Sequence, residues 1–276
     1  MPGRIDGKVA LITGAARGQG RALAVRMAEE GADIIAVDNC ADCTMAYPGG
    51  TKEDLKETAS MVTGLGRRVV TGVVDVRDLP ALEAAVAEGV AELGRLDVVA
   101  ANAGISGPAS FQEMTETQWE EMIATNRGGV WRTCKAGVPH IIEGGRGGSV
   151  ILTSSGAALK GFANIGHYAA AKAGILGLMR TLAHELGAHR IRVNSILPTT
   201  VDTPMVQNDA LYRLFVPTVD SPTRDDLAQV TTTMHALPVP WVDPIDIANA
   251  ALFFAGDESR YITGAALPVD AGILVR

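Results

Sequence analysis

Short apolar runs rich in β-branched residues alternate along the chain with longer stretches in which apolar residues recur at helical spacing. The runs predict strands over residues 9–12, 34–37, 69–74, 98–101, 150–153, 193–196 and 266–269. Helical spacing predicts helices over residues 21–30, 54–65, 82–93, 117–142, 168–187 and 244–255. The strands are apolar almost throughout, which is typical of a parallel sheet with helices on both faces. We therefore expect an α/β fold, a three-layer doubly wound Rossmann fold with a mostly parallel seven-stranded sheet.

Two long connections interrupt this alternation. Residues 39–52 follow the second predicted strand, where a few residues usually suffice. Residues 203–241 contain five prolines, which predicts a partly helical, mobile segment. Both connections leave the sheet at the carboxyl ends of strands, where open α/β sheets bind ligands. We expect a single domain over residues 1–276, in which 39–52 lies near a bound ligand and 203–241 forms a lid, with plain surface excursions as the alternative.

Composition excludes several classes of protein. A chain of 276 residues with 47% hydrophobic residues has enough apolar side chains for a large core, which excludes a disordered chain. A net charge of −7 and 4% aromatic residues argue against nucleic acid or an anionic membrane surface as partner. Three cysteines form no disulfide framework, residues 1–7 lack signal-peptide features, and no apolar run is long enough to span a bilayer. We expect a cytoplasmic protein.

A glycine-rich turn follows the first predicted strand. Gly14, Gly18 and Gly20 allow the backbone to approach a pyrophosphate, and the start of the next helix offers free N–H donors. The spacing is Gly-x3-Gly-x-Gly, which differs from the common dinucleotide fingerprint, so a tight turn without a ligand is the alternative.

Asp38, at the end of the second predicted strand, favours NAD over NADP as the dinucleotide. Its carboxylate can accept hydrogen bonds from both ribose hydroxyls of NAD and would repel the 2′-phosphate of NADP. Arg17 argues for NADP, because a cation beside that ribose could pair with the phosphate. We give Asp38 more weight, since a desolvated contact between carboxylate and phosphate costs more than a surface arginine returns.

Tyr168 and Lys172 are candidates for acid–base chemistry. They are four residues apart, so they share one face of a helix. A phenol has a pKa near 10, and a drop of about 3 units is needed for proton exchange near neutral pH. A neighbouring ammonium and a cationic nicotinamide ring both stabilise the phenolate. On its own the spacing is common by chance, and a packed tyrosine beside a solvated lysine is the alternative.

The motifs together resemble a known family. In chain order they are Thr13-Gly14-x3-Gly18-x-Gly20, Asn102-Ala103-Gly104, Asn126, Ser155 and Tyr168-x3-Lys172. In order and spacing they closely resemble the short-chain dehydrogenase/reductase family over essentially the whole chain. The chain departs from the family pattern at Ala101, where asparagine is usual, and at Thr199, where Pro-Gly is usual. Neither departure removes a chemical group that the mechanism needs.

The resemblance implies roles for four catalytic residues. Tyr168 would exchange a proton with the substrate oxygen, and Ser155 would donate a hydrogen bond to that oxygen. Lys172 would hold the nicotinamide ribose and lower the pKa of the phenol. Asn126 would order a water molecule that links Lys172 to solvent.

The resemblance also implies a set of cofactor-binding residues for NAD. Asp75 and Val76 resemble an adenine-binding pair, and residues 198–203 resemble the segment whose backbone meets the carboxamide. The full set is Gly14, Arg17, Gly18, Gln19, Gly20, Asp38, Asn39, Cys40, Asp75, Val76, Asn102, Ala103, Gly104, Tyr168, Lys172, Pro198, Val201 and Thr203. No metal site is expected, because the pair Cys40 and Cys43 has no second ligand pair at metal spacing.

Shorter matches point to one branch of the family. Residues 37–40, 75–78, 101–104 and 237–241 resemble the carveol-dehydrogenase-like branch, which is associated with mycofactocin-dependent oxidoreductases. In that branch the insertion, here 39–52, is thought to fold over NAD, so that the bound cofactor is recycled by an external redox partner. The family's habit of forming tetramers, with small and apolar residues on more than one face of the helices predicted at 117–142 and 168–187, implies a homotetramer.

These features predict an oxidoreductase that transfers hydride between NAD and a hydrophobic secondary alcohol or ketone, terpenoid- or steroid-like. Leu211, Leu214, Phe215 and Val216 would form the apolar inner face of the lid. One alternative is an NADPH-dependent 3-oxoacyl-carrier-protein reductase, which Asp38 and the lack of an obvious Lys/Arg cluster oppose. The other is a non-catalytic dinucleotide-sensing protein, which has no need of the four catalytic residues.

Overall fold

The computed structural model describes residues 3–42 and 47–276. Seven strands form one sheet in the order β3-β2-β1-β4-β5-β6-β7. They are β1 (Val9–Thr13), β2 (Asp33–Asp38), β3 (Val69–Val73), β4 (Val98–Ala101), β5 (Gly148–Thr153), β6 (Ile191–Pro198) and β7 (Ala266–Val269). Every pairing between these strands is parallel. The predicted fold is confirmed, and the strand order reverses between β1 and β4, which opens a crevice at their carboxyl ends.

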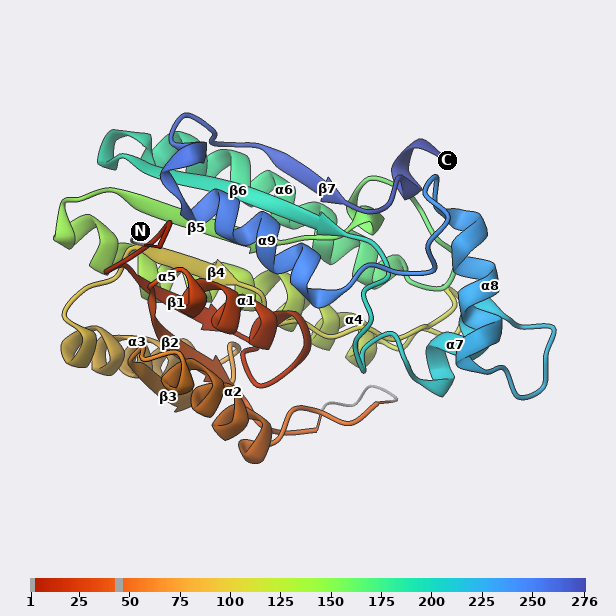
Figure 1. The fold of residues 1–276 in the computed structure, drawn as a ribbon. Helices are drawn as coiled ribbons and strands as arrows, with labels where there is room; N and C mark the ends of the chain where they lie inside the picture. The colour runs from red at the N-terminus through yellow and green to blue at the C-terminus, as the bar shows by residue number, and fades with distance from the viewer. Residues whose placement is uncertain (1–2, 43–46) are drawn as a thin grey trace.

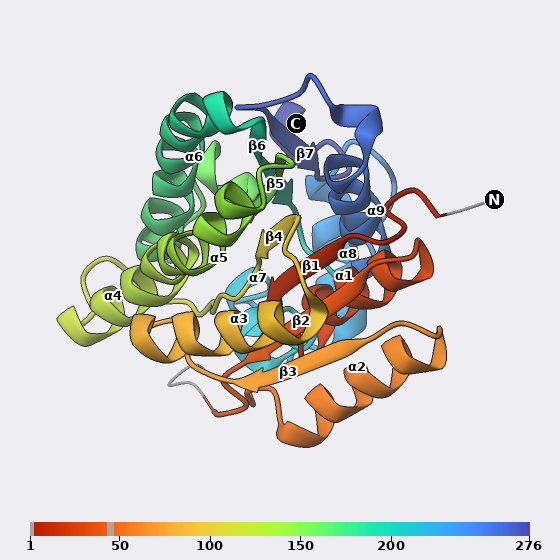
Figure 2. The ribbon, with the colours of Figure 1, turned by 90° about the vertical axis from the view of Figure 1, so that its left-hand side faces the viewer.

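Helices cover both faces of the sheet (Figures 1 and 2). One face carries α1 (Gly18–Glu29), α2 (Lys52–Gly64) and α9 (Pro244–Ala255). The opposite face carries α3 (Leu79–Leu93), α5 (Val130–Gly144) and α6 (Gly166–Leu186). Because both faces are covered, the central strands are buried on both sides, which is why they are apolar at nearly every position, whereas the edge strands β3 and β7 are partly exposed.

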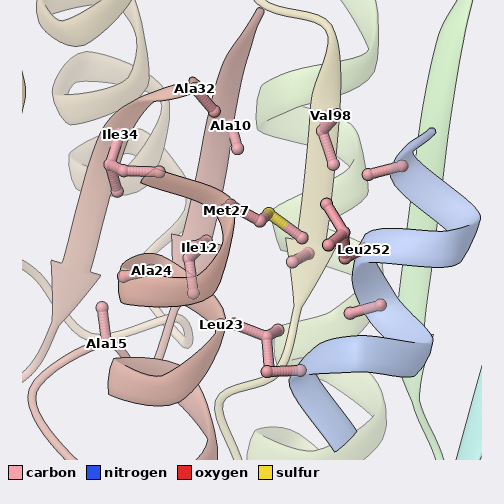
Figure 3. Packing of buried hydrophobic residues seen from close by; sticks show 14 of the residues in the cluster. Ala10, Ile12, Ala15, Leu23, Ala24, Met27, Ala32, Ile34, Val98 and Leu252 are labelled. Atoms are coloured by element: carbon pink, nitrogen blue, oxygen red, sulfur yellow. The ribbon is translucent and has the colours of Figure 1, made fainter. Parts of the chain in front are cut away.

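The core between the sheet, α1 and α9 shows how the helices are fixed. Leu23 and Met27 of α1 and Leu252 of α9 pack over Ile12 and the neighbouring strands, and all four side chains are at most 1% exposed (Figure 3). Since α1 begins directly at the glycine-rich turn, packing of its apolar face also fixes the orientation of that turn.

The helix predicted over residues 117–142 is wrong as one continuous element. The structure has α4 (Glu116–Ile123), a π-helical turn at Ala124–Gly129 and then α5. A Cβ at Gly129 would lie 2.5 Å from Cγ2 of Val76, so the absence of a side chain permits the close approach of this turn to the connection after β3. The turn itself, ATNRGG, has almost no apolar pattern, and helical spacing on both sides of it gave no sign of the break.

The segment 203–241 is partly helical, as predicted. It contains α7 (Asp209–Phe215) and α8 (Arg224–Met234), which lie beyond the carboxyl ends of the strands. The connection after β2 extends toward the same edge of the sheet (Figure 1). The two long connections therefore flank the crevice between them.

The packing of α9 predicts how much the free energy of unfolding falls when a cavity is made in this core. We expect Leu252→Ala to lower the free energy of unfolding by about 2–5 kcal/mol, because a fully buried leucine loses its contacts and leaves a void. Urea unfolding followed by circular dichroism measures the change. Leu65→Ala is the matched control, because Leu65 is 42% exposed. An equal, small effect of both substitutions would contradict the assignment of this core.

Candidate active site

One cavity at the carboxyl edge of the sheet collects nearly all of the predicted site residues. Its walls include Gly14, Arg17, Gly18, Gln19, Gly20, Asp38, Asn39, Asp75, Val76, Asn102, Ala103, Gly104, Ser155, Tyr168, Lys172, Pro198, Val201 and Thr203. Cys40 and Asn126 are not part of the wall and lie behind it. Residues from the ends of six strands, β1 to β6, thus meet in one place, although they are spread over most of the chain.

The glycine-rich turn has the geometry of an anion cradle. Gly14 and Gly18 have φ of +70° and +55°, a region that L side chains rarely adopt. A Cβ at Gly20 would lie 1.8 Å from the carbonyl oxygen of Gly14, so only glycine fits. The first turn of α1 faces the cavity here, and the buried side-chain oxygen of Gln19 has no partner. Free N–H groups at a helix start fit a pyrophosphate.

Asp38 is held rigidly at the edge of the cavity. Its Oδ2 accepts a hydrogen bond from the Ala16 amide at 3.0 Å, and its Oδ1 accepts one from the Cys40 amide at 3.0 Å. A carboxylate has about four acceptor sites, so both oxygens can still accept from ribose hydroxyls. The site therefore fits a nucleotide with a free 2′-hydroxyl.

The side chain of Arg17 contacts two residues of the insertion 39–52. Its guanidinium lies 5.9 Å from the centre of the Tyr47 ring and donates a hydrogen bond to the carbonyl of Pro48. This position weakens the argument that Arg17 would bind a 2′-phosphate, because the cation is already engaged with chain residues.

The connections after β3 and β4 form the next part of the wall. Burial alone would raise the pKa of Asp75, but hydrogen bonds from Arg77 and its charge hold that pKa below its ordinary value. The amides of Asn102 and Ala103 donate to Thr13 Oγ1 at 3.2 and 3.3 Å. The Asn102 side chain also donates to the Thr13 carbonyl at 3.1 Å. Thr13 therefore fixes this connection against the glycine-rich turn.

Ser155, Tyr168 and Lys172 meet where α6 packs on the end of β5. Lys172 Nζ donates to the carbonyl of Thr153 at 2.8 Å, and it lies 5.6 Å from the centre of the Tyr168 ring. Ser154 Oγ donates to the Lys172 carbonyl at 2.8 Å, which ties the two elements together. Ser155 hydrogen-bonds the Tyr168 side chain. Of the two adjacent serines, Ser155 is thus the one that faces the phenol.

Burial acts on the two titratable groups in opposite directions. It raises the pKa of Tyr168, and the hydrogen bond with Ser155 opposes that rise. It lowers the pKa of Lys172 to about 8. The phenol therefore needs additional positive charge nearby before it can lose its proton near neutral pH.

Asn126 holds a neighbouring connection rather than lining the cavity. Its side chain donates to the Ile105 carbonyl at 2.8 Å and accepts from the Ile105 amide at 2.7 Å. A Cβ at Gly104 would lie 2.9 Å from Asn126 Oδ1 and 3.6 Å from Lys172 Nζ, so the two polar groups flank Gly104. The predicted water-ordering role then depends on the second lone pair of Oδ1 or on backbone groups of the π-helical turn.

The segment after β6 closes over the glycine-rich turn. Val201 is buried, and the side chain of Thr203 would lie 3.2 Å from a Cβ at Gly18. Pro198, Val201 and Thr203, which the resemblance assigns to cofactor binding, all line the cavity. The carboxyl end of β6 therefore faces the start of α1 across the site.

An apolar wall adjoins Ser155 and Tyr168. Leu211, Leu214 and Phe215 line the cavity as expected, whereas Val216 is buried elsewhere. Further apolar residues that the sequence analysis missed complete this wall: Phe162, Ile165, Met205, Val206, Met234 and Ile273. Their sequence signal was weak because they come from irregular connections and from the C-terminal residues. Only their proximity in chain order to Ser155, Tyr168 or Thr203 could have suggested some of them.

Tyr47 is the most informative residue that the sequence analysis missed. It is 7% exposed, and its hydroxyl accepts a hydrogen bond from the Ser106 amide at 3.2 Å. The insertion therefore crosses from Arg17 on one side of the cavity to Ser106 on the other. An aromatic residue amid Pro and Gly in a long insertion was the available signal.

Other chemistry-bearing residues lie away from the site. His167 lies next to Tyr168 in the chain, but it is 1% exposed and does not line the cavity. Burial and the charge of Asp38 raise the pKa of the Cys40 thiol to about 11, and Cys43 lies outside the described residues. Within residues 3–42 and 47–276, no group of His, Cys, Asp and Glu could hold a metal ion. No helix in this part of the chain is both long and apolar enough to cross a bilayer.

Known proteins share this architecture along the whole chain. The (−)-trans-carveol dehydrogenase of Rhodococcus erythropolis is 54% identical over 99% of each chain. The crystal structure of carveol dehydrogenase from Mycobacterium avium in complex with NAD is 57% identical, with a TM-score of 0.98 over 99% of this chain and 100% of that one.

A second solved structure is more distant. The short chain dehydrogenase from Mycobacterium paratuberculosis bound to NAD is 44% identical, with a TM-score of 0.91 over 99% of this chain and 100% of that one. The sheet order, the cavity and these matches agree, and the chain belongs to the short chain dehydrogenase family, whose model matches residues 8–212.

Proposed function

We propose that the protein transfers hydride between NAD and a hydrophobic secondary alcohol or the corresponding ketone. The observation that carries this proposal is the position of Ser155, Tyr168 and Lys172, between a nucleotide cradle and an apolar wall of one cavity. The names of the M. avium and R. erythropolis relatives support both the cofactor and a terpenoid-like substrate.

Each of the three residues has a distinct task in alcohol oxidation. Ser155 Oγ and the Tyr168 hydroxyl hold the substrate oxygen, and Tyr168 accepts the proton that the alcohol loses. Lys172 holds the cofactor's ribose, and its ammonium, fixed by Thr153, stabilises the phenolate. Bound NAD supplies the hydride acceptor and a positive charge on its nicotinamide ring. Asn126 supports the connection beside Lys172, and the remaining predicted residues of the wall hold the nucleotide.

The composition of the wall favours a substrate with a single polar end. Leu214, Phe215, Phe162 and Ile273 lie on the walls of the same cavity as Ser155 and Tyr168. Each buried methylene group contributes about 0.8 kcal/mol to binding, so a compact ring system gains much from this wall. A monocyclic terpenoid or a steroid alcohol has this character.

We propose that the insertion 39–52 covers the cofactor and retains it. Tyr47 spans the cavity to Ser106, and Arg17 is paired with Pro48, so the insertion is anchored at both sides. A retained cofactor must be reoxidised in place, which calls for an external redox partner such as mycofactocin. In this proposal residues 1–276 act as one domain, with 203–241 as the substrate lid.

We also propose a homotetramer in the cytoplasm. The small residues Ala170, Ala173 and Gly177 are exposed along α6, at spacing that places them on one face. A smooth exposed face of this kind suits packing against a second copy, and sedimentation of the purified protein tests it. The cytoplasmic location is based on the absence of disulfides among the described cysteines, Cys40 and Cys134.

Two measurements test the proposal. Mass spectrometry of nucleotide released on denaturing freshly dialysed protein should give near-stoichiometric NAD(H). Oxidation of carveol should then require an artificial electron acceptor. Protein that carries no nucleotide but oxidises carveol with added NAD would contradict retention while supporting the reaction. Release of NADP would contradict the assignment of Asp38.

We expect Tyr168→Phe to lower the rate of alcohol oxidation by about 10²–10⁴-fold, because the proton acceptor is removed while the ring still packs. Steady-state assays with carveol measure the loss, and the Kd for NAD should stay within a factor of about two. Tyr261→Phe is the control, since Tyr261 is 88% exposed and outside the cavity. Activity that survives unchanged in Tyr168→Phe would overturn the mechanism.

The buried ammonium predicts a pH dependence. Lys172→Met removes the charge that stabilises the phenolate, so the pKa of Tyr168 rises and the rate of alcohol oxidation increases only at higher pH. We expect the midpoint of the pH–rate profile to move upward by about one unit or more, along with a fall in the maximal rate. Lys56→Met, at an exposed position of α2, should leave the profile unchanged. An unshifted midpoint in Lys172→Met would show that this ammonium does not tune the phenol.

The hydrogen bond between Tyr47 and Ser106 leads to a prediction for the dissociation rate of NAD. We expect Tyr47→Phe to increase the dissociation rate of NAD by about fivefold, because one hydrogen bond that closes the insertion, worth about 1 kcal/mol, is lost. Stopped-flow displacement of NADH fluorescence measures the rate. Tyr261→Phe again serves as the control, and an equal dissociation rate in both variants would contradict the role of the insertion.

A further inference from the structure

Thr199 occupies the position at the end of β6 where the family usually has glycine, and its side chain makes a specific contact. Thr199 Oγ1 lies 2.7 Å from Nε2 of His235, which follows the last residue of α8. His235 is 1% exposed, whereas Thr199 lines the substrate cavity. Thr199 of the cavity wall is thus hydrogen-bonded to the buried His235 near the end of the lid segment 203–241.

The hydrogen-bond partners of His235 determine the direction of this bond. Nδ1 lies 2.7 Å from the carbonyl oxygen of Val239, which can only accept, so Nδ1 carries a proton. In the neutral ring Nε2 is then an acceptor, and the Thr199 hydroxyl donates to it. A side chain without a hydroxyl at position 199 would leave this buried nitrogen without a donor.

The residues next to His235 bind the C-terminal residues of the chain. The amides of Ala236 and Leu237 both donate to the carbonyl of Ala271 at 3.0 Å. A Cβ at Gly272 would lie 2.6 Å from Cβ of Ala236, so the two segments are in close contact. Ile273, which follows, lines the cavity together with Met234.

The outer part of the lid, which consists of α7 and α8, is held by an ion pair and by side-chain hydrogen bonds. Asp202 forms an ion pair with Arg224 at 2.6 Å and accepts a hydrogen bond from Gln207, which in turn accepts one from Tyr212 of α7. Arg224 also lies 4.4 Å from the centre of the Trp241 ring. These contacts hold α7 and α8 without involving His235, so the inner wall formed by Met234 and Ile273 has its own support.

We propose that Thr199 and His235 are a positioning pair that fixes Met234 and Ile273 against the substrate and thereby sets the preference for a cyclic apolar alcohol over a small one. This inference rests on the proposed function. Loss of the bond lets the segment 234–237 and the bound C-terminal residues shift outward. A ring-sized substrate then loses contacts, while a small alcohol that occupies only the end near Ser155 and Tyr168 is unaffected.

The test compares Thr199→Val, which has nearly the same shape without the hydroxyl, with Thr199→Ser, which keeps it. For Thr199→Val we expect the KM for carveol to rise at least fivefold, with kcat within twofold of wild type. The KM for 2-propanol and the Kd for NAD should not change. Thr199→Ser should behave as wild type, as should Thr233→Val, whose hydroxyl bonds only within α8, to Val230.

A second variant disturbs the same wall from the C-terminal side. Gly272→Ala places a methyl group 2.6 Å from Cβ of Ala236, at a residue whose φ of +82° is strained for an L side chain, and should raise the KM for carveol selectively as well. Circular dichroism of both variants shows that they are folded before their KM values are compared. Equal effects on carveol and 2-propanol in both variants, or failure of Thr199→Ser to restore wild-type values, would overturn the positioning role.

Calorimetry separates this inference from the proposed function. If wild type oxidises neither alcohol, the proposed reaction is wrong, but the affinity of NAD-loaded protein for carveol still tests the pair. Weaker binding in Thr199→Val and wild-type binding in Thr199→Ser support the inference, and equal affinities in all three proteins refute it.

Discussion

The attachment of α6 to the end of β5 is the interaction on which the chemistry of this protein depends. Ser154 donates to the Lys172 carbonyl, and the Lys172 ammonium donates to the carbonyl of Thr153, each at 2.8 Å. These two bonds link the strand that carries Ser155 to the helix that carries Tyr168. The distance between the serine and the phenol is therefore fixed by backbone groups of two regular elements, which makes the site rigid before any ligand binds.

The same attachment has an energetic cost. Lys172 is 4% exposed, and burial lowers its pKa to about 8, so the ammonium is less stable here than in water. Burial also raises the pKa of Tyr168. In the proposed reaction a cation and a phenolate in a dry site would offset both effects, because they stabilise each other more strongly there than in solvent. In that mechanism the apolar residues around the site take part in the acid–base chemistry as well as in binding the substrate.

The regular part of the fold could be predicted from the sequence, and the irregular part could not. Strands 98–101 and 266–269 and the helix 244–255 were predicted to the residue, because short apolar runs and a Pro start give clear local signals. The π-helical turn was missed because its six residues, ATNRGG, carry almost no apolar pattern and helical spacing resumes directly after them.

The residues of the site likewise fall into those that the sequence predicted and those that it did not. Those at strand ends and on α6 follow from motif and spacing, because parallel strands bring their carboxyl ends to one edge. Tyr47, Met234 and Ile273 lie in segments whose path depends on long-range contacts, such as Tyr47 with Ser106 or Ala236 with Ala271. The strand ends and α6 therefore supply the residues of the proposed proton transfer and, through Asp38, the preference for NAD, while irregular segments supply much of the apolar wall of the cavity. Such segments can change without disturbing β5 and α6, so specificity can vary in this fold while the reaction stays the same.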